Sequence, residues 1–356
     1  MYPVREVSNA LQTSIDEVAE ALRGNSSFSL LTHVQPDADA LGSMLALGMA
    51  LKQMGKSVTC CTLGSERLRF LPGYERLAEP PRRDPGADVL VYLDCATLAR
   101  AEPLTDQMPQ AELDRPDQNC PDQRDGQRNR ALVINIDHHI SNEGFGDIIW
   151  IDPQSSSVGE MMWLLFTELG TDVDGDMAAN LYASIVNDTG QFAFHNTTRR
   201  THEVAGALLH HEFGVNTIHK KLFYERSLAQ TRLLARALDS LWLRHDGRVA
   251  VMQLSREDFA GAGLGSDDSE GFINQAMNVS GVLTGMFVRE VEPELCRVSF
   301  RSRGHVDVNV LAGCFGGGGH VRASGCTLNM SLAQALPLLL EALDAAVYDA
   351  RGDVQG

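Results

Sequence analysis

The sequence lacks the features of a secreted or membrane protein. Its seven cysteines are odd in number and include no CxxC pair, which argues against a disulfide framework and against a thiolate zinc site. No run approaches the roughly 20 apolar residues that cross a bilayer, and no signal-peptide pattern opens the chain. We therefore expect a protein of the reducing cytoplasm that does not contact membranes.

Basic residues are also scarce. Thirty Lys and Arg stand against 47 Asp and Glu, which gives a formal net charge of −17. This charge is opposite to that of a protein that grips long nucleic acid through a basic track. An anionic substrate would have to be held locally, by metal ions and a few arginines. The 356 residues, 44% of them hydrophobic, suffice for two domains with substantial cores.

Short apolar runs rich in Val, Ile and Leu alternate with helical patterns in the first half of the chain. The strand-like runs lie at 28–33, 57–63, 88–95 and 131–139, and the helical patterns lie at 44–55 and 158–170. Strands buried on both faces have this composition, so the pattern predicts a parallel α/β sheet. Segment 102–130, dense in Gln, Asp, Pro and Arg, predicts a mobile surface excursion.

The second half of the chain predicts a smaller α/β domain. A run from about 202 to 240 is compatible with continuous helix, and strand-like and helical patterns alternate after it. We therefore predict a first domain at 1–205, a helical connector at 206–240 and a second domain at 241–350.

Side chains that bind metals stand mostly at the ends of the predicted strands. They are, in chain order, His33, Asp37, Asp39, Asp94, Asp137, His138, His139 and, after a helical stretch, Asp188. Because the carboxyl ends of parallel strands meet at one edge of a sheet, we expect these residues to converge. Carboxylates and imidazoles without thiolates suit Mn²⁺ or a similar divalent ion, with zinc as an alternative. Two such ions sharing a carboxylate can polarise a phosphoryl group and activate water.

Each of these residues alone has a simpler interpretation. Asp39 could be a helix N-cap, as an aspartate before a helical pattern often is. Adjacent histidines at the end of an apolar strand are harder to explain by packing, because buried imidazoles need partners. The joint occurrence favours a metal site. His210, His211 and His219 lie in a helical polar pattern, and we interpret them as surface residues.

The second half contains candidate phosphate-binding residues. Arg301 and Arg303 are two positions apart, so on a strand they share one face, and guanidinium groups bind phosphate bidentately. The glycines before His320 leave backbone N–H groups open and can form an anion-binding nest, although such a run alone is more typical of a turn. The predicted substrate-binding residues are Arg301, Arg303, Gly317, Gly318, Gly319 and His320.

The ordered segments HVQPDADALGS, VYLDC, NIDHH and NDTG resemble the four motifs of the DHH phosphoesterases, in the RecJ-like superfamily. VSFRSRGHVDVNVLAGCFGGGGHVRASG resembles the DHHA1 domain that accompanies them, so the resemblance covers about 28–328. It implies an N-terminal parallel-sheet DHH domain, a smaller C-terminal α/β DHHA1 domain and an active-site cleft between them.

The resemblance also implies roles for the candidate residues. His33 and Asp37 would hold one divalent ion, His138, Asp39 and Asp188 would hold the other, and Asp94 would bridge them. His139 would contact the scissile phosphate, and Asp137 would orient its neighbours. The two ions would be Mn²⁺ foremost, with Mg²⁺, Co²⁺ or Zn²⁺ as alternatives.

Because no motif departs from the family pattern, the resemblance implies an active enzyme. It is closest in organisation to hydrolases of short oligoribonucleotides (nano-RNA, linear dinucleotides) that also act on 3′-phosphoadenosine 5′-phosphate. A soluble cyclic-dinucleotide phosphodiesterase is the runner-up, and a non-catalytic nucleotide sensor is the alternative of a different class. The sequence leaves the oligomeric state open, a homodimer included.

Overall fold

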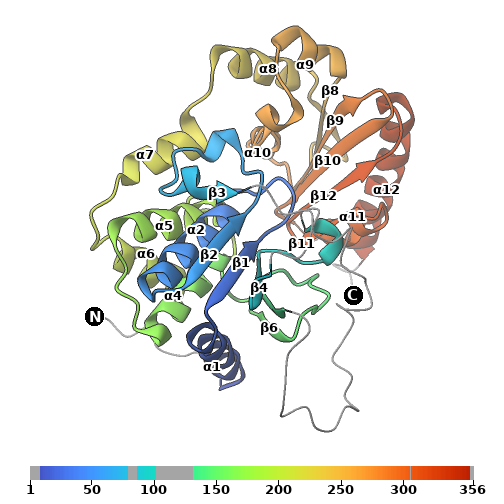
Figure 1. Ribbon diagram of the computed structural model, residues 1–356. Coiled ribbons are helices and arrows are strands. Elements are labelled where there is room, and N and C mark those ends of the chain that lie inside the picture. Colours follow the sequence, from blue (N-terminus) through green and yellow to red (C-terminus); the bar gives the residue numbers. More distant parts are fainter. Residues whose placement is uncertain (1–8, 79–85, 102–130, 305, 353–356) are drawn as a thin grey trace. The chain divides into compact units, whose positions relative to one another are not determined.

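The computed structural model describes residues 9–78, 86–101, 131–304 and 306–352. The chain divides into two compact units, one ending at Tyr224 and the other beginning at Glu225, and this division falls within the predicted connector. Each unit has its own six-stranded sheet (Figure 1). The predicted excursion at 102–130 lies outside the described residues. No described helix is long and apolar enough to cross a membrane.

The sheet of the first unit is parallel throughout, in the order β3-β2-β1-β4-β5-β6. The predicted parallel α/β fold is therefore confirmed. Its strands are β1 (Ser27–Leu31), β2 (Ser57–Cys61), β3 (Leu77–Ala78), β4 (Val89–Leu93), β5 (Leu132–Asp137) and β6 (Ile148–Ile151). Strands β3 and β6 were not expected. Strand β3 has only two residues, and β6 is joined to β5 by a ten-residue loop instead of a helix.

Helices cover one face of this sheet. They are α1 (Asn9–Gly24), α2 (Ala38–Gln53), α4 (Val158–Leu169), α5 (Gly175–Asp188), α6 (Arg199–Leu208) and α7 (Val215–His219) (Figure 1). Their buried side chains form the main core with Leu30, Val91 and Ile134 of the strands. The opposite face carries a smaller cluster around Tyr92, whose ring meets Phe145 edge-on at 5.2 Å.

Small residues let α2, α4 and α5 approach closely. A Cβ atom on Gly42 of α2 would lie 2.5 Å from the backbone oxygen of Asn180 in α5, and one on Gly159 of α4 would lie 2.0 Å from Ser184 Oγ. Such distances exclude any larger residue without backbone movement. This close packing brings Asp39, in the first turn of α2, next to Ser184 of α5.

The helix-compatible run near 202–240 is interrupted. After α6 and α7 come a π-helical turn (Lys220–Tyr224) and a new helix, α8 (Leu228–Asp239), which Ser227 begins with a capping box. His219, which we interpreted as a surface residue, is half-buried, with its ring nitrogens 3.1 Å from Tyr182 Oη and 3.2 Å from Gln191 Oε1.

The second unit contains a mixed sheet in the order β11-β12-β10-β9-β8-β7, in which only the β8–β9 pair of described strands is parallel. The strands are β7 (Trp242–Arg244), β8 (Val249–Leu254), β9 (Thr284–Glu292), β10 (Leu295–Ser302), β11 (Gly318–His320) and β12 (Ala323–Leu328). The further helices are α9 (Arg256–Ala262), α10 (Ile273–Met277), α11 (Val308–Gly313) and α12 (Leu332–Gly352). Phe300 and Leu339 belong to the core between the sheet and α12, and Phe259 and Phe287 to a second core with α8 to α10.

Candidate metal centre

The candidate ligands lie where the order of the first sheet reverses direction. Strand β1 has β2 on one side and β4 on the other, and Leu31 at the end of β1 is paired with Tyr92 near the end of β4. In open α/β sheets this arrangement leaves a crevice at the carboxyl ends of the strands. His33 follows β1, Asp94 follows β4 and Asp137 ends β5. The predicted convergence is therefore built into the sheet topology.

Asp94 has an unusual backbone. Its φ of +56° is left-handed, although it is not glycine, and its N–H donates to the carbonyl of Ile136 on β5 at 3.0 Å. Residues held in this region commonly mark functional sites, because the neighbouring structure must offset the strain. The turn places Asp94 Oδ2 3.6 Å from His33 Nε2 and Oδ1 3.6 Å from His138 Nε2.

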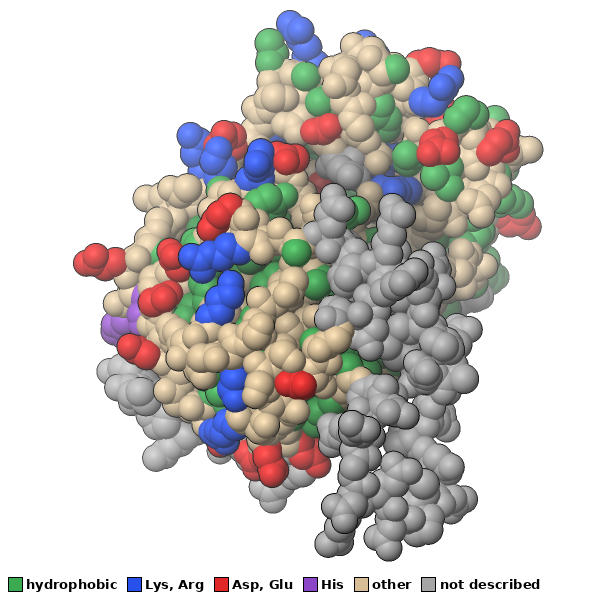
Figure 2. All heavy atoms as spheres, viewed as in Figure 1, with side chains coloured by type: hydrophobic (Ala, Val, Ile, Leu, Met, Phe, Trp, Pro, Cys, Tyr) green, Lys and Arg blue, Asp and Glu red, His purple; other side chains and the backbone are tan. Residues whose placement is uncertain are grey.

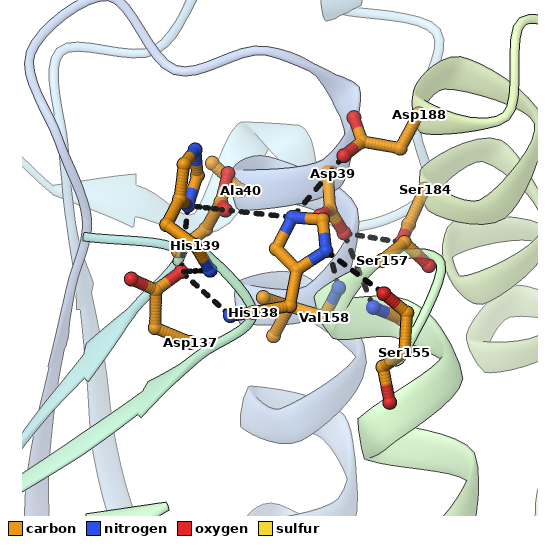
Figure 3. A network of polar contacts seen from close by, with 12 residues as sticks. Asp39, Ala40, Asp137, His138, His139, Ser155, Ser157, Val158, Ser184 and Asp188 are labelled. Carbon is orange, nitrogen blue, oxygen red and sulfur yellow. Dashed lines mark hydrogen bonds and ion pairs between the residues drawn. The ribbon is translucent and has the colours of Figure 1, made fainter. Parts of the chain in front are cut away.

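The two aspartates of the HVQPDADALGS segment, Asp37 and Asp39, face different partners. Asp37, not Asp39, is the N-cap of α2, and its Oδ1 accepts from the N–H groups of Asp39 and Ala40. Asp39 is fully buried and turns toward α4 and α5 (Figure 3). Its carboxylate accepts from the N–H groups of Val158 and Gly159 at 2.9 and 3.1 Å. The N-terminus of α4 thus stabilises the carboxylate.

Asp137 orients both neighbouring histidines. Its Oδ1 accepts from the backbone N–H groups of His138 and His139 at 2.8 and 3.2 Å, and from His139 Nδ1 at 2.7 Å. Asn142 donates to its other oxygen at 2.5 Å. Asp137 is fully buried, and its contacts are those of a residue that fixes imidazole orientation.

His138 lies at the centre of the polar network in Figure 3. Its Nδ1 is 3.2 Å from the carbonyl oxygen of Ser155, which can only accept, so Nδ1 carries the proton. Nε2 faces Asp188 Oδ2 at 3.2 Å and Asp39 Oδ2 at 3.5 Å. In the neutral ring this nitrogen presents a lone pair, which is the form that binds metals.

The six predicted ligands fall into two groups. Asp94 belongs to the first group and lies next to His138 of the second. The ligand atoms of His33, Asp37 and Asp94 all lie within 4.8 Å of one another. The same limit holds for Asp39, His138 and Asp188, the last residue being the C-terminal residue of α5. Asn187 spans the groups, since its Nδ2 donates to Asp37 Oδ2 and to Asp188 Oδ1, at 3.2 Å each.

Crowded carboxylates dominate the electrostatics. Loss of solvation, reinforced by the charges of Asp188 and Asp94, raises the pKa of Asp37 to about 7 and also raises the pKa of Asp39. Burial acts to raise the pKa of Asp94, but the three nearby histidines lower it overall. Burial acts to lower the pKa of His33 and His138, and the carboxylates beside them raise it instead. The histidines only partly compensate the negative charge.

This arrangement fits divalent cations. Among the described residues, no hydrogen-bond donor reaches the buried Oδ1 of Asp94, the atom that faces both His138 and His139. A buried carboxylate oxygen without a donor is costly unless a cation neutralises it. Oxygen and imidazole donors without thiolates match the preferences of Mn²⁺ and related ions.

The predicted substrate-binding residues lie in the second unit. Arg301 is on β10, on the face opposite the buried Phe300, and its Nη1 donates to the Phe300 carbonyl. Arg303 lies just beyond the end of β10, where its Nη1 donates to the carbonyl of Met277. Only Arg301 of the two arginines lies within the strand, because β10 ends at Ser302.

The glycine run has a packing role of its own. Gly318 to His320 form the edge strand β11. A Cβ atom on Gly317 would meet the backbone oxygen of Gly325 at 2.2 Å, and Gly319 has a φ of +146°. Glycine is required at these two positions for the turn and for close pairing with β12, whatever the loop binds.

Several residues that hold the candidate ligands in place were not predicted. Ser155 accepts from His138, Ser184 donates to Asp39 Oδ1 at 2.5 Å, and Asn142 donates to Asp137. Ser184 lies 145 positions from Asp39 in the chain, so no local pattern could link them. Asn187 had a usable signal, since it directly precedes Asp188.

Comparisons with known proteins cover nearly the whole chain. The DHH family, N-terminal domain, matches residues 27–186, and the DHHA1 domain matches residues 246–349. The bifunctional oligoribonuclease and PAP phosphatase NrnA of Thermus thermophilus is 33% identical over 92% of this chain and 92% of its own length. The protein of the same name from Bacillus subtilis is 30% identical, covering 83% of this chain and 87% of its own. The solved structure of an exopolyphosphatase-related protein from Bacteroides fragilis has a TM-score of 0.80 at 25% identity, covering 97% and 98% of the two chains.

Proposed function

Because the chain belongs to the DHH family of phosphoesterases, with a DHHA1 domain after the DHH domain, we propose that it hydrolyses short oligoribonucleotides to nucleoside monophosphates. Linear dinucleotides are included among the substrates, and 3′-phosphoadenosine 5′-phosphate is a second substrate that yields AMP. The observation that carries the proposal is the complete set of six ligand-type side chains at the carboxyl edge of the first sheet.

The ligand assignment follows the two groups of side chains. His33 and Asp37 would hold one divalent ion, and Asp39, His138 and Asp188 would hold the other. Asp94 would serve both, which its position beside both groups supports. We take Mn²⁺ as the leading ion on the oxygen and imidazole donor set. When bound, the two ions supply Lewis-acid polarisation of a phosphoryl oxygen and a nucleophilic water at neutral pH.

His139 is the protein group that contacts the reacting phosphate. Asp137 holds its Nδ1 at 2.7 Å, and the other ring nitrogen points away from Asp137 (Figure 3). Asp137 thereby fixes the ring orientation that this contact requires.

The second unit binds the part of the substrate remote from the reaction. The candidate residues are Arg301, Arg303, the Gly317 to Gly319 segment and His320. Arginine forks suit phosphate, and short substrates suit a chain of net charge −17. On the face in Figure 2, Lys and Arg side chains of the described residues stand interspersed with Asp and Glu, which supports local recognition over a basic track. The odd cysteine count supports a reducing cytoplasm as the compartment.

A substrate panel tests the proposal. Metal-depleted protein would be incubated with a linear diribonucleotide, a cyclic dinucleotide and 3′-phosphoadenosine 5′-phosphate, with and without Mn²⁺. We expect Mn²⁺-dependent release of mononucleotides from the linear substrate and AMP from the third. Faster cleavage of the cyclic substrate would point to a cyclic-dinucleotide phosphodiesterase. Binding without turnover of any of the three would point to a sensor.

A further inference from the structure

Arg200 makes a buried ion-pair network that lies outside every motif named above. Its side chain, 17% exposed on α6, donates from Nε to Glu160 Oε1 at 2.5 Å and from Nη2 to Asp152 Oδ2 at 2.9 Å. Nη2 also lies 2.9 Å from Ser155 Oγ. Glu160 is fully buried. One guanidinium thus joins two carboxylates from different segments, a geometry that a single ammonium cannot copy.

The surrounding polar groups complete the network. Glu160 Oε2 accepts from Ser156 Oγ at 2.6 Å and from Thr201 Oγ1 at 2.8 Å. Asn196 donates to the Ser156 carbonyl at 2.9 Å and to the Asp188 carbonyl at 3.1 Å. We call this set the Arg200 network; it comprises Asp152, Ser155, Ser156, Glu160, Asn196, Arg200 and Thr201. It fixes the short connection between β6 and α4.

That connection presents partners to two candidate ligands. The Ser155 carbonyl accepts from His138 Nδ1. Ser157, the N-cap of α4, sets the first turn whose Val158 and Gly159 N–H groups donate to Asp39. Asn196 adds a contact to the backbone of Asp188. All three contacted ligands belong to the same group of side chains.

The other group is held differently. Asp37 is fixed by the N–H groups of its own helix α2, and His33 Nδ1 lies 2.8 Å from the Val34 carbonyl. Among the described residues, no hydrogen bond or ion pair joins the Arg200 network to His33 or Asp37. Asn187 and the shared Asp94 link the two groups, but their other supports are separate.

We propose that Arg200 is a positioning residue for one of the two metal sites, the one formed by Asp39, His138 and Asp188. The proposal rests on the two-metal function proposed above. Arg200 touches neither substrate nor metal; it holds the Ser155 carbonyl and the N-terminus of α4 where those ligands need them. Residues that orient metal ligands in this way typically change metal affinity by about 10- to 100-fold when replaced.

The test measures Mn²⁺ binding directly, by counting free Mn²⁺ from its electron paramagnetic resonance signal. In Arg200→Lys, which keeps the charge but loses the fork, we expect one of the two sites to weaken by about 10- to 100-fold and the other to stay unchanged. Arg199→Lys is the matched control. Arg199 is the adjacent residue on α6, its side chain is 92% exposed, and among the described residues its ion pair is with Glu203.

Two backgrounds identify the weakened site. His33→Ala leaves the Asp39, His138 and Asp188 group, so adding Arg200→Lys should weaken the remaining ion. Asp188→Asn leaves the other group, and there Arg200→Lys should change nothing. Ser155→Ala removes the hydroxyl that contacts Arg200 but keeps the carbonyl that accepts from His138. It should weaken the same site to a smaller degree, and it decides the matter if Arg200→Lys does not fold.

Equal weakening of both sites, or a lowered melting temperature with both affinities unchanged, would overturn the role of Arg200. The proposed function fails separately. Wild-type protein that binds fewer than two Mn²⁺ ions would refute the two-metal function itself, before any variant is compared.

Discussion

Asp37 and Asp39 of the first unit differ in their electrostatics from Asp344 of the second unit. In the first unit, Asp37 and Asp39 are crowded by other carboxylates and by loss of solvation, and their pKa values rise. In the second, Asp344 pairs with Arg244 and His245, and these hydrogen bonds lower its pKa against the opposing effect of burial. The half-buried ion pair of Asp344 balances charge within the fold. Buried carboxylates such as Asp37 and Asp39, whose negative charges are not balanced by neighbouring cationic side chains, indicate a place for a bound cation.

The largest effect is expected at the carboxylate that both groups of candidate ligands share. Asp94→Asn removes the carboxylate shared by both groups of ligands, so turnover of a linear dinucleotide should fall by about a thousandfold or more, on the order of the loss from an essential electrostatic group. Mn²⁺ content should fall with it. Asp88→Asn is the control, since Asp88 is an exposed aspartate directly before the first residue of β4, at the opposite end of the strand from Asp94. Near-normal turnover in Asp94→Asn would refute the assignment.

The next effect concerns the second unit. His320→Ala or Arg301→Ala should lower kcat/KM for a dinucleotide by roughly 10- to 100-fold, the equivalent of one hydrogen bond to a charged group. A small chromogenic phosphodiester should be affected far less, because remote contacts act on substrates that reach them. Arg256→Ala, on the exposed surface of α9, is the control. Equal losses on both substrates would give the second unit another role.

A smaller effect should follow from charge outside the site. A longer RNA carries phosphates that a chain of net charge −17 repels, so kcat/KM should be highest on RNAs of about two to five nucleotides and lower on one several times longer. Raising the salt from 0.1 M to 1 M shortens the Debye length from about 10 Å to about 3 Å, which should narrow the gap. Equal efficiencies at low salt, or processive degradation of the longer RNA, would contradict this expectation.

The sequence predicted the clustering of the candidate site residues better than it predicted the residues that support them. The convergence of His33, Asp94 and Asp137 was predictable because metal-binding residue types at the ends of apolar strands leave a local signal. Arg200 and Ser184 left none, since they act through contacts over 40 to 145 positions and belong to ordinary helices.

The strands show the same limit. Strands β4 and β5 were predictable from continuous apolar runs, whereas β11 is the glycine-rich GGH and forms only by pairing with β12. The helical pattern near 202–240 did not reveal the breaks in that segment, for a related reason. Its periodicity continues through Ser227, where a capping box starts a new helix.

The smallest effect sharpens the comparison between the two kinds of aspartate. Asp344→Asn removes an ion pair whose side chains are about one-third exposed, so solvent screening limits its contribution to unfolding free energy to about 0.5 kcal/mol. The folded-state pKa of Asp344 lies below its ordinary value. Its stabilising contribution is therefore fully present above the unfolded-state pKa of about 3.9 and is lost as the pH falls through the folded-state pKa. Chemical denaturation of wild type and Asp344→Asn should differ slightly at pH 7 and converge in acid. Asp174→Asn, at the N-cap of α5 in the first unit, provides a comparison variant that leaves this pair intact. If the difference in unfolding free energy grew as the pH fell, the folded state would raise the pKa of Asp344 and not lower it, as it does for Asp37 and Asp39.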